Sequence, residues 1–340
     1  MPTDQPLRLG TRGSQLALWQ ANTVAARIAA AGGPRCHVTV IKTDGDRLQS
    51  RPLSEIGGKG LFVKEIEDAL LAGDIDLAVH SSKDMAAVLP EGLTIAGVLP
   101  RENPLDALVL PVRTDASGAR GQERSGEPDA PGTQPSALTL EGLLAALGPA
   151  PSIGTGSVRR IAQLMRLLPG ARFAGIRGNL DTRLRKLDEG AHDALVLAAA
   201  GLNRLGFGSR ISFAIPAAAC VPAPGQGIVA IEIRAGDPRA ADAVARITDA
   251  VTADALTAER ALLATLGGGC QTPVGALASV VEGDQLEIIA AVIALDGSRL
   301  ISGRASAARA DADGLGRRVA TQLLADGAGD ILADAQKARP

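Results

Sequence analysis

The sequence predicts an α/β protein made of two similar lobes and a smaller α+β domain at the C-terminal end. Its 340 residues exceed what one hydrophobic core normally organises. Short β-branched runs alternate with helical patterns in two successive blocks, which is typical of βαβ units and a largely parallel sheet. After the second block, the pattern changes to a long helical region followed by consecutive strands. These observations together indicate three domains.

The first block alternates strands with helices. The strand at 76–80 is short and apolar and runs directly into a polar stretch, so it should be buried with polar residues at its carboxyl end. Ser14 stands just before the first helical pattern, where serine is a favoured cap. Strands are predicted at 7–10, 37–42, 76–80 and 93–98, and helices at 15–31 and 60–72.

The second block repeats this construction, and the C-terminal region does not. Strands are predicted at 106–110, 152–154, 172–176 and 194–198, and helices at 140–147, 158–168, 180–188 and near Leu202. A strand at 228–233 then leads to a helical region at 238–266, strands at 274–281, 285–295 and 299–307, and a helix at 313–324.

Domain boundaries follow from these patterns. The first domain is predicted to comprise residues 1–100 with 226–240, the second 101–225, and the third 241–340. Within the second, residues 113–135 contain no aliphatic side chain larger than alanine. Such a segment buries too little apolar surface to offset the entropy of ordering. We expect a disordered surface insertion there, in preference to a functional tail or partner site.

The composition excludes several classes of protein. A net charge of −2 argues against binding nucleic acid through bulk electrostatics. No uncharged apolar stretch approaches the ~20 residues that a membrane-spanning helix needs. The three cysteines are few and unclustered, which argues against a disulfide framework and a cysteine-ligated metal. Few cysteines and no visible secretory signal favour a reducing cytoplasm. We expect a monomer that binds neither nucleic acid, membrane nor metal.

Cations recur where predicted strands run into helices, at the ends where two-lobed α/β proteins bind ligands. Residues 154–160 read GTGSVRR, a small-residue turn whose N–H groups and positive helix end favour an anion. Arg159 and Arg160 oppose the helix dipole unless an anion is bound, so anion binding is favoured over simple capping by Ser157. Single arginines are commonly surface charges. The recurrence in both blocks argues otherwise for Arg12, Arg177, Arg183 and Arg204.

Two other segments are ambiguous by themselves. Lys83 and Asp84 follow the buried strand, where an acid beside a lysine can handle protons. From this segment alone, a capping acid and a solvated lysine are slightly favoured. The sequence GGKG at 57–60 lacks the spacing of a nucleotide-binding loop. We therefore predict a mobile lid there, with Lys59 facing the cleft.

Cys270 stands on a glycine-rich turn, directly after three glycines. Buried cysteines usually serve as small hydrophobes, but this setting makes the thiol more accessible than those of Cys36 and Cys220. Accessibility is only part of reactivity, because a thiol has a pKa of ~8.5 unless its surroundings favour the thiolate. The histidines are scattered, so a cysteine–histidine hydrolase is possible only through His80.

The motifs, taken in order, resemble those of the porphobilinogen deaminases, also called hydroxymethylbilane synthases. The resemblance covers nearly the whole chain except 113–135. It implies two lobes like those of type II periplasmic binding proteins and a third domain that carries a dipyrromethane cofactor through a thioether to Cys270. The motifs are RGS at 12–14, GGKGLF at 57–62, HSSKD at 80–84, the segment 154–160, RGN at 177–179, PGQG at 224–227 and GCQ at 269–271.

The resemblance also implies an activity and residue roles. Four porphobilinogen molecules would be condensed head to tail with release of ammonia, and the linear tetrapyrrole would then be released by hydrolysis. Asp84 would be the catalytic group that assists loss of ammonia and stabilises the resulting azafulvene cation. The implied cofactor-binding residues are Cys270, Lys83, Ser81, Thr155, Ser157, Arg159, Arg160, Arg183 and Arg204. The implied substrate-binding residues are Arg12, Ser14, Arg177, Lys59 and Phe62.

Two rival functions stay open from the residues alone. A non-enzymatic two-lobed carrier of a small carboxylate fits the lobes, but it leaves the third domain and Cys270 unexplained. A cysteine-dependent acyl transferase requires a histidine within reach of Cys270. Only the deaminase predicts a protein heavier than its sequence by two linked pyrrole units.

Overall fold

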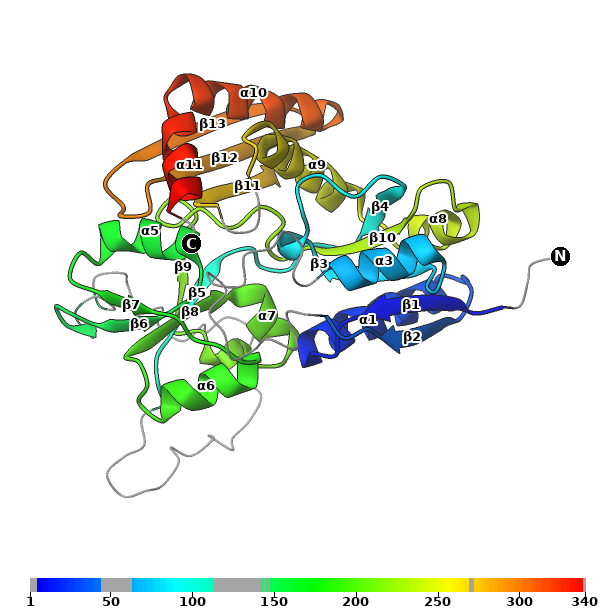
Figure 1. Cartoon of the computed structure of the whole chain (residues 1–340), viewed down its shortest axis with the longest axis horizontal. Helices are drawn as coiled ribbons and strands as arrows, with labels where there is room; N and C mark the ends of the chain where they lie inside the picture. The colour runs from blue at the N-terminus through cyan, green and yellow to red at the C-terminus, as the bar shows by residue number, and fades with distance from the viewer. Residues whose placement is uncertain are drawn as a thin grey trace.

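The computed structural model describes residues 5–43, 63–112, 142, 145, 147–268 and 272–338. Three sheets organise these residues, one in each of two lobes and one in a third domain (Figure 1). The predicted lid, the insertion at 113–135, most of the helix at 140–147 and the turn that carries Cys270 lie outside the described residues.

The first lobe is a five-stranded sheet of order β2-β1-β3-β10-β4, covered by helices on both faces. Apolar residues of α1 and α8 pack on one face, and those of α3 pack on the other. The strands are β1 (Leu7–Thr11), β2 (Cys36–Val40), β3 (Leu77–Ser81), β4 (Leu93–Val98) and β10 (Val229–Arg234), and the helices are α1 (Gln15–Ala30), α3 (Lys64–Ala72) and α8 (Pro238–Ala245).

The second lobe is a five-stranded sheet of order β7-β6-β8-β5-β9. Leu164 of α5 packs on one face, while Leu187 of α6 and Leu202 of α7 pack on the other. The strands are β5 (Asp106–Val109), β6 (Ser152–Gly154), β7 (Arg172–Ala174), β8 (Ala194–Ala198) and β9 (Phe213–Ile215), and the helices are α5 (Val158–Leu167), α6 (Leu180–Asp188) and α7 (Ala199–Arg204).

The two lobes share one topology. Each sheet has one strand that runs antiparallel to both neighbours, β10 in the first lobe and β5 in the second. The chain reaches each of these strands from the other lobe, through two segments that we call the crossing segments. Residues 99–105 lead from the first lobe to β5, and residues 216–228 lead from the second lobe to β10. The prediction of two α/β lobes with largely parallel sheets is therefore confirmed, and the reversed strand follows from the crossings.

The crossing segments lie against each other. The Glu102 N–H donates to the Gly227 carbonyl at 3.0 Å. Gly227 has a φ of +86°, and a Cβ there would collide with the Glu102 carbonyl. Only glycine fits this conformation and this close approach without strain. The contact fixes how the two lobes are joined.

The third domain is an antiparallel sheet of order β11-β12-β13, backed by helices. It contacts both lobes, through α9 against β4 and through β12 against α5. The strands are β11 (Val274–Val280), β12 (Gln285–Ile293) and β13 (Leu300–Ala308), and the helices are α9 (Ala250–Thr265), α10 (Ala312–Ala325) and α11 (Ala328–Lys337).

The predicted helical region at 238–266 is confirmed as helical but contains a break, and one strand and one α-helix were not predicted. The region 238–266 forms two helices, because Asp249 caps α9 by accepting a hydrogen bond from the Thr252 N–H at 2.8 Å. The chain leaves the first lobe at this break, since α8 belongs to the core of that lobe and α9 to the core of the third domain. Strand β9 and helix α11 are additional. The predicted domain boundaries stay a prediction.

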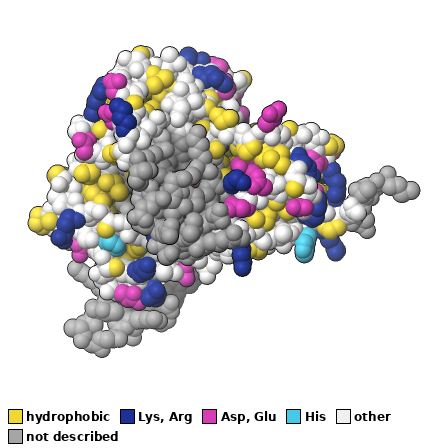
Figure 2. Space-filling view, viewed as in Figure 1, with side chains coloured by type: hydrophobic (Ala, Val, Ile, Leu, Met, Phe, Trp, Pro, Cys, Tyr) yellow, Lys and Arg dark blue, Asp and Glu magenta, His cyan; other side chains and the backbone are white. Residues whose placement is uncertain are grey.

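The surface carries mixed charges. Figure 2 shows basic and acidic side chains interspersed over both lobes and the third domain, as expected for a net charge of −2. Within the described ranges, no helix is both long and apolar enough to span a bilayer, and no group of three or more His, Cys, Asp or Glu side chains is arranged to hold a metal ion.

Candidate active site

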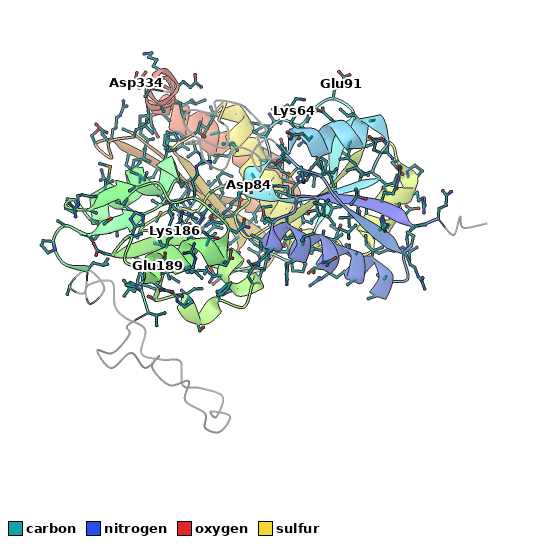
Figure 3. All side chains as sticks on the ribbon, turned by 60° about the horizontal axis from the view of Figure 1, so that its bottom comes forward. Lys64, Asp84, Glu91, Lys186, Glu189 and Asp334 are labelled. Atoms are coloured by element: carbon teal, nitrogen blue, oxygen red, sulfur yellow. The ribbon has the colours of Figure 1, made fainter. Side chains whose placement is uncertain are left out.

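Polar residues at the ends of β1 and β3 surround a pocket in the first lobe. Its walls include Arg12, Ser14, Gln20, Ser81 and Asp84. The Gln20 amide donates to the Ser81 hydroxyl at 2.9 Å, which fixes both side chains. Figure 3 shows Asp84 in the middle of the molecule, where the lobes meet. The structure thus brings together four predicted site residues and adds Gln20, which was not predicted.

Lys83 lies beside this pocket and reaches the second crossing segment. Its ammonium donates to the Gln226 amide oxygen at 3.3 Å. Burial, and after it the positive charge of Arg160, lower the pKa of Lys83 from 10.5 to about 8, against the opposing charges of Asp84 and Asp106. Lys83 is therefore a cation under electrostatic strain, and an anionic ligand would relieve that strain.

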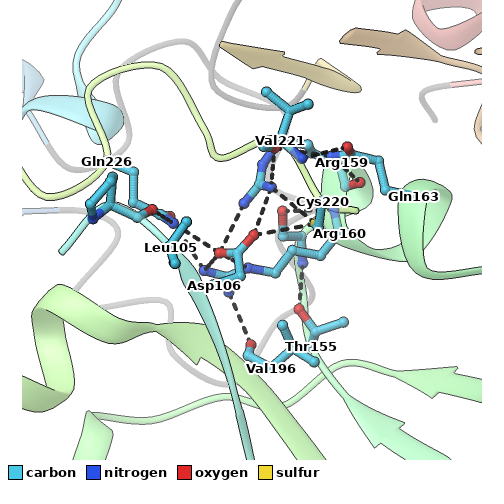
Figure 4. Close-up of polar contacts among 12 residues, drawn as sticks. Leu105, Asp106, Thr155, Arg159, Arg160, Gln163, Val196, Cys220, Val221 and Gln226 are labelled. Carbon is cyan, nitrogen blue, oxygen red and sulfur yellow. Dashed lines mark hydrogen bonds and ion pairs between the residues drawn. The ribbon is translucent and has the colours of Figure 1, made fainter. Parts of the chain in front are cut away.

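Asp106, at the start of β5, holds two arginines of α5 (Figure 4). Arg159 donates to both Asp106 oxygens, at 2.8 and 3.2 Å, and Arg160 donates through Nε at 2.9 Å. Asp106 is fully buried, which alone would raise its pKa. The two guanidinium charges outweigh that effect and hold the pKa of Asp106 far below its usual range. The carboxylate is ionised at any physiological pH.

Asp106 offsets the charge that Arg159 and Arg160 place at the positive end of α5. We expected Arg159 and Arg160 to require a bound anion, and the chain itself supplies one in Asp106. Arg159 also donates to the Val221 carbonyl at 2.7 Å, and Arg160 donates to the Val196 carbonyl at 3.0 Å. The two arginines are therefore oriented by the protein, and any ligand contact would be additional.

The remaining predicted residues of 154–160 support the same helix start. Ser157 caps α5 by accepting a hydrogen bond from the Arg160 N–H at 3.4 Å, as predicted for a capping serine. Thr155 is 1% exposed, and its hydroxyl accepts from the Ser157 N–H at 3.4 Å. Both hydroxyls thus contribute to the turn itself.

Arg183 of the second lobe lies within electrostatic range of Asp84 of the first, with Arg177 close to it. Burial lowers the pKa of Arg183, and the charges of Arg160 and Arg177 lower it further, while the charge of Asp84 opposes them. Arg183 is anchored by donating from Nε to the Gly178 carbonyl at 2.8 Å. The Nη2 atom of Arg177 is buried and has no hydrogen-bond partner among the described residues. Positive charge is therefore crowded on this side of the interface.

Arg204 connects the lobes. It donates to the Gly227 carbonyl of the second crossing segment at 2.7 Å. Its guanidinium also lies over the ring of Trp19 in α1, 5.6 Å from the centroid, within the range of a cation–π contact. Its predicted contact with a cofactor stays a prediction, since these contacts are internal to the protein.

Three predicted residues cannot be placed, and two central ones were not predicted. Lys59, Phe62 and Cys270 lie outside the described residues. Asp106 was missed, although an acid that opens the apolar run DALVL was a signal that it has a buried partner. Gln226 was noted only as part of the PGQG motif, with no role.

Two family models match the chain. "Porphobilinogen deaminase, dipyromethane cofactor binding domain" matches residues 7–242, and "Porphobilinogen deaminase, C-terminal domain" matches residues 253–325. A solved structure, substrate binding domain 2 of Lactococcus lactis GlnP, is 11% identical, covers 78% of this chain and 93% of that chain, and has a TM-score of 0.39. Likeness of that degree does not bear on function.

Curated relatives match over almost the full length. The porphobilinogen deaminase of Syntrophobacter fumaroxidans is 42% identical over 337 residues, which are 99% of this chain and 100% of that protein. The porphobilinogen deaminase of Moorella thermoacetica is 44% identical over 328 residues, which are 96% of this chain and 95% of that protein. The resemblance in the sequence motifs is confirmed by these matches, and the chain belongs to the porphobilinogen deaminase family.

Proposed function

We propose that the pocket around Asp84 carries out the condensation and that cations of both lobes bind the carboxylates of the substrate and the growing chain. The family activity is hydroxymethylbilane synthesis, in which four porphobilinogen molecules are joined on a dipyrromethane cofactor with loss of ammonia. The chain is thus a transferase of porphyrin and heme biosynthesis, and this assignment is favoured over the carboxylate carrier. The observation that supports the residue roles is the position of one acid, Asp84, opposite crowded cations.

The described residues fit a dipyrromethane group, which carries four carboxylates. The pKa values of Lys83 and Arg183 are lowered, first by burial and then by neighbouring positive charge. The Nη2 of Arg177 and the Nε of Arg159 are buried donors with no hydrogen-bond partner among the described residues. Carboxylates would satisfy these donors and relieve the repulsion between the cations. When bound, the group supplies the pyrrole carbon to which the first substrate is joined.

Asp84 is proposed to hold and move the protons of the reaction at its carboxylate oxygens. A fixed anion close to a developing cation stabilises the charge that forms as the substrate loses its amine. The same carboxylate would accept hydrogen bonds from pyrrole N–H groups and orient the rings. Positioned proton transfer typically contributes a factor of ~10²–10⁴. Ser81, held by Gln20, and Arg12 would orient the substrate on the pocket wall.

Replacement of Asp84 by alanine tests this role. The variant should keep the cofactor but lose turnover by about 10²-fold or more, because the anion beside the developing cation is gone. Production of the tetrapyrrole is followed spectroscopically, and retention of the cofactor by intact mass. Turnover near that of the unmodified enzyme would refute the assignment of Asp84.

Attachment of the cofactor to Cys270 is proposed from the motif at 269–271. The purified protein should exceed its sequence mass by two linked pyrrole units, and Cys270→Ser should lose that excess. Cys36→Ser is the matched control and should keep it, because Cys36 lies at the start of β2 in the first sheet. An unmodified thiol at position 270 in active enzyme would contradict the proposal.

We further propose that the protein is a cytoplasmic monomer that binds neither nucleic acid nor membrane. Cys36 and Cys220 are unpaired, which suits a reducing compartment. Light scattering during gel filtration should give the mass of one chain, 34.5 kDa plus the cofactor. A mass twice as large would contradict the monomer.

A further inference from the structure

We infer that Gln226 is a positioning residue that orients Lys83 of the first lobe and Arg160 of the second for binding carboxylates. It does so from the second crossing segment, where it also connects the two crossings. This inference rests on the proposed roles of Lys83 and Arg160. It assigns a task to the PGQG motif, which the proposed chemistry leaves unexplained.

The amide of Gln226 joins four groups from different parts of the fold. Its nitrogen donates to the Pro104 carbonyl at 2.7 Å and to Asp106 Oδ1 at 2.9 Å. Its oxygen accepts from Lys83 Nζ at 3.3 Å and from Arg160 Nη2 at 3.4 Å. An amide has two N–H hydrogens and two oxygen lone pairs, so the capacity of this side chain is filled. The opposite amide orientation is excluded, since it would point N–H groups at two cations.

The backbone around Gln226 leaves the side chain little freedom. The flanking residues Gly225 and Gly227 have φ values of +74° and +86°, which favour glycine. A Cβ on Gly225 would collide with the Ser82 hydroxyl and press on the Lys83 N–H. The Gln226 carbonyl accepts from Arg101 Nε at 2.9 Å. With 1% of its surface exposed, Gln226 is a fixed point between the lobes.

A neutral acceptor suits this place better than a charged one. A carboxylate between Lys83 and Arg160 would neutralise them and compete with the carboxylates of the substrate. It would also bring a second negative charge to within 2.9 Å of Asp106 Oδ1, where Gln226 now donates. Glutamine orients both cations and adds no negative charge to that of Asp106, which is already paired with Arg160. The motif thus explains how cations from two lobes share one orientation.

Gln226→Met tests the inference, because methionine has a similar volume and no hydrogen bond. In the holoenzyme, the KM for porphobilinogen should rise roughly tenfold while kcat changes little, the pattern of lost ground-state binding. Loss of the acceptor should also move the alkaline limb of kcat/KM to lower pH, since the Lys83 ammonium loses a hydrogen bond that favours it.

Gln163→Met is the matched control. Gln163 is also a buried glutamine that holds the second crossing segment, through the Val221 N–H at 2.8 Å and carbonyl at 3.1 Å. It contacts neither Lys83 nor Arg160 among the described contacts. Gln163→Met should lower the free energy of unfolding and leave the KM for porphobilinogen and the alkaline limb of kcat/KM unchanged. The inference is overturned if Gln163→Met changes the KM and the alkaline limb of kcat/KM as much as Gln226→Met does. It is also overturned if Gln226→Met leaves both the KM and the alkaline limb unchanged.

Two further variants keep the test decisive. If Gln226→Met does not fold, Gln226→Glu replaces it, and its negative charge should move the alkaline limb to higher pH. An unmoved limb in that variant overturns the inference. Lys83→Met separates this inference from the proposed function: if its KM equals that of the unmodified enzyme, Lys83 does not bind substrate, and the proposed role fails whatever Gln226 does.

Discussion

Replacing Asp106 by asparagine removes the anion that two buried arginines share. Asp106 accepts hydrogen bonds from Arg159 at 2.8 and 3.2 Å and from Arg160 at 2.9 Å, and all three side chains are buried. Removing one partner of a buried ion pair costs about 3–5 kcal/mol, because an uncompensated charge remains. We expect Asp106→Asn to lower the free energy of unfolding by about this amount.

Urea denaturation followed by circular dichroism measures the loss, and Asp313→Asn is the matched control. Asp313 also accepts two hydrogen bonds from one arginine, Arg317, at 2.6 and 3.2 Å, but the pair is exposed. Exposed pairs contribute about 0–1 kcal/mol. If the two variants lose the same small amount, the Asp106 cluster does not stabilise the fold and the reasoning fails.

The pH dependence gives an independent check with a definite sign. The pKa of Asp106 in the folded protein lies far below its value in the unfolded chain, ~3.9. A depressed pKa contributes stability that is fully present above the unfolded pKa and is lost as the pH falls below it. The difference in stability between the unmodified protein and Asp106→Asn should therefore narrow below about pH 4. A difference that widens in acid would contradict the assignment.

Three further outcomes follow from the same structure. Burial and the charge of Arg160 lower the pKa of Lys83 to about 8. Assembly of the cofactor on the apo protein should therefore slow as the pH rises through about 8, as measured by intact-mass time courses. Lys83→Arg should abolish that slowing. Trp19 is the single tryptophan of the chain, so Arg204→Gln should increase the quenching of its fluorescence by acrylamide, and unchanged quenching would exclude the cation–π contact. Glu259 is fully buried and accepts from Arg101 at 2.6 Å and from the Gly225 N–H at 2.6 Å, so Glu259→Gln should cost about 3–5 kcal/mol in urea denaturation, and a loss below 1 kcal/mol would contradict it.

Local signals in the sequence predicted several of the helix starts and strand ends that carry the candidate site residues. Ser14 and Ser157 cap the helices that they precede, as expected from their side chains. The buried strand before Lys83 and Asp84 is present, and the polar turn follows it. These features depend on neighbours within a few residues, which is why hydrophobic periodicity and capping preferences reveal them.

Contacts between distant segments were beyond such signals. Asp106 stands 53 residues before Arg159 in the chain, and no local pattern pairs them. The reversed strands β5 and β10 depend on how the chain crosses between lobes, which strand propensity does not encode. The break between α8 and α9 was not predicted within the helical region 238–266, although aspartate is a favoured cap and Asp249 stands directly before α9.

The cations around Asp84 fall into two groups with different tasks. Arg159 and Arg160 are paired with Asp106, and pulling either away would leave a buried carboxylate uncompensated. Lys83 and Arg183 have lowered pKa values because they are buried among like charges, so a ligand carboxylate stabilises them on binding. Substrate carboxylates should therefore bind first to Lys83 and Arg183, while the pairs with Asp106 keep the second lobe rigid. Arg160, although paired with Asp106, also donates to Gln226 and lies near Lys83, so a carboxylate bound at Lys83 would add to the pair with Asp106 without replacing it.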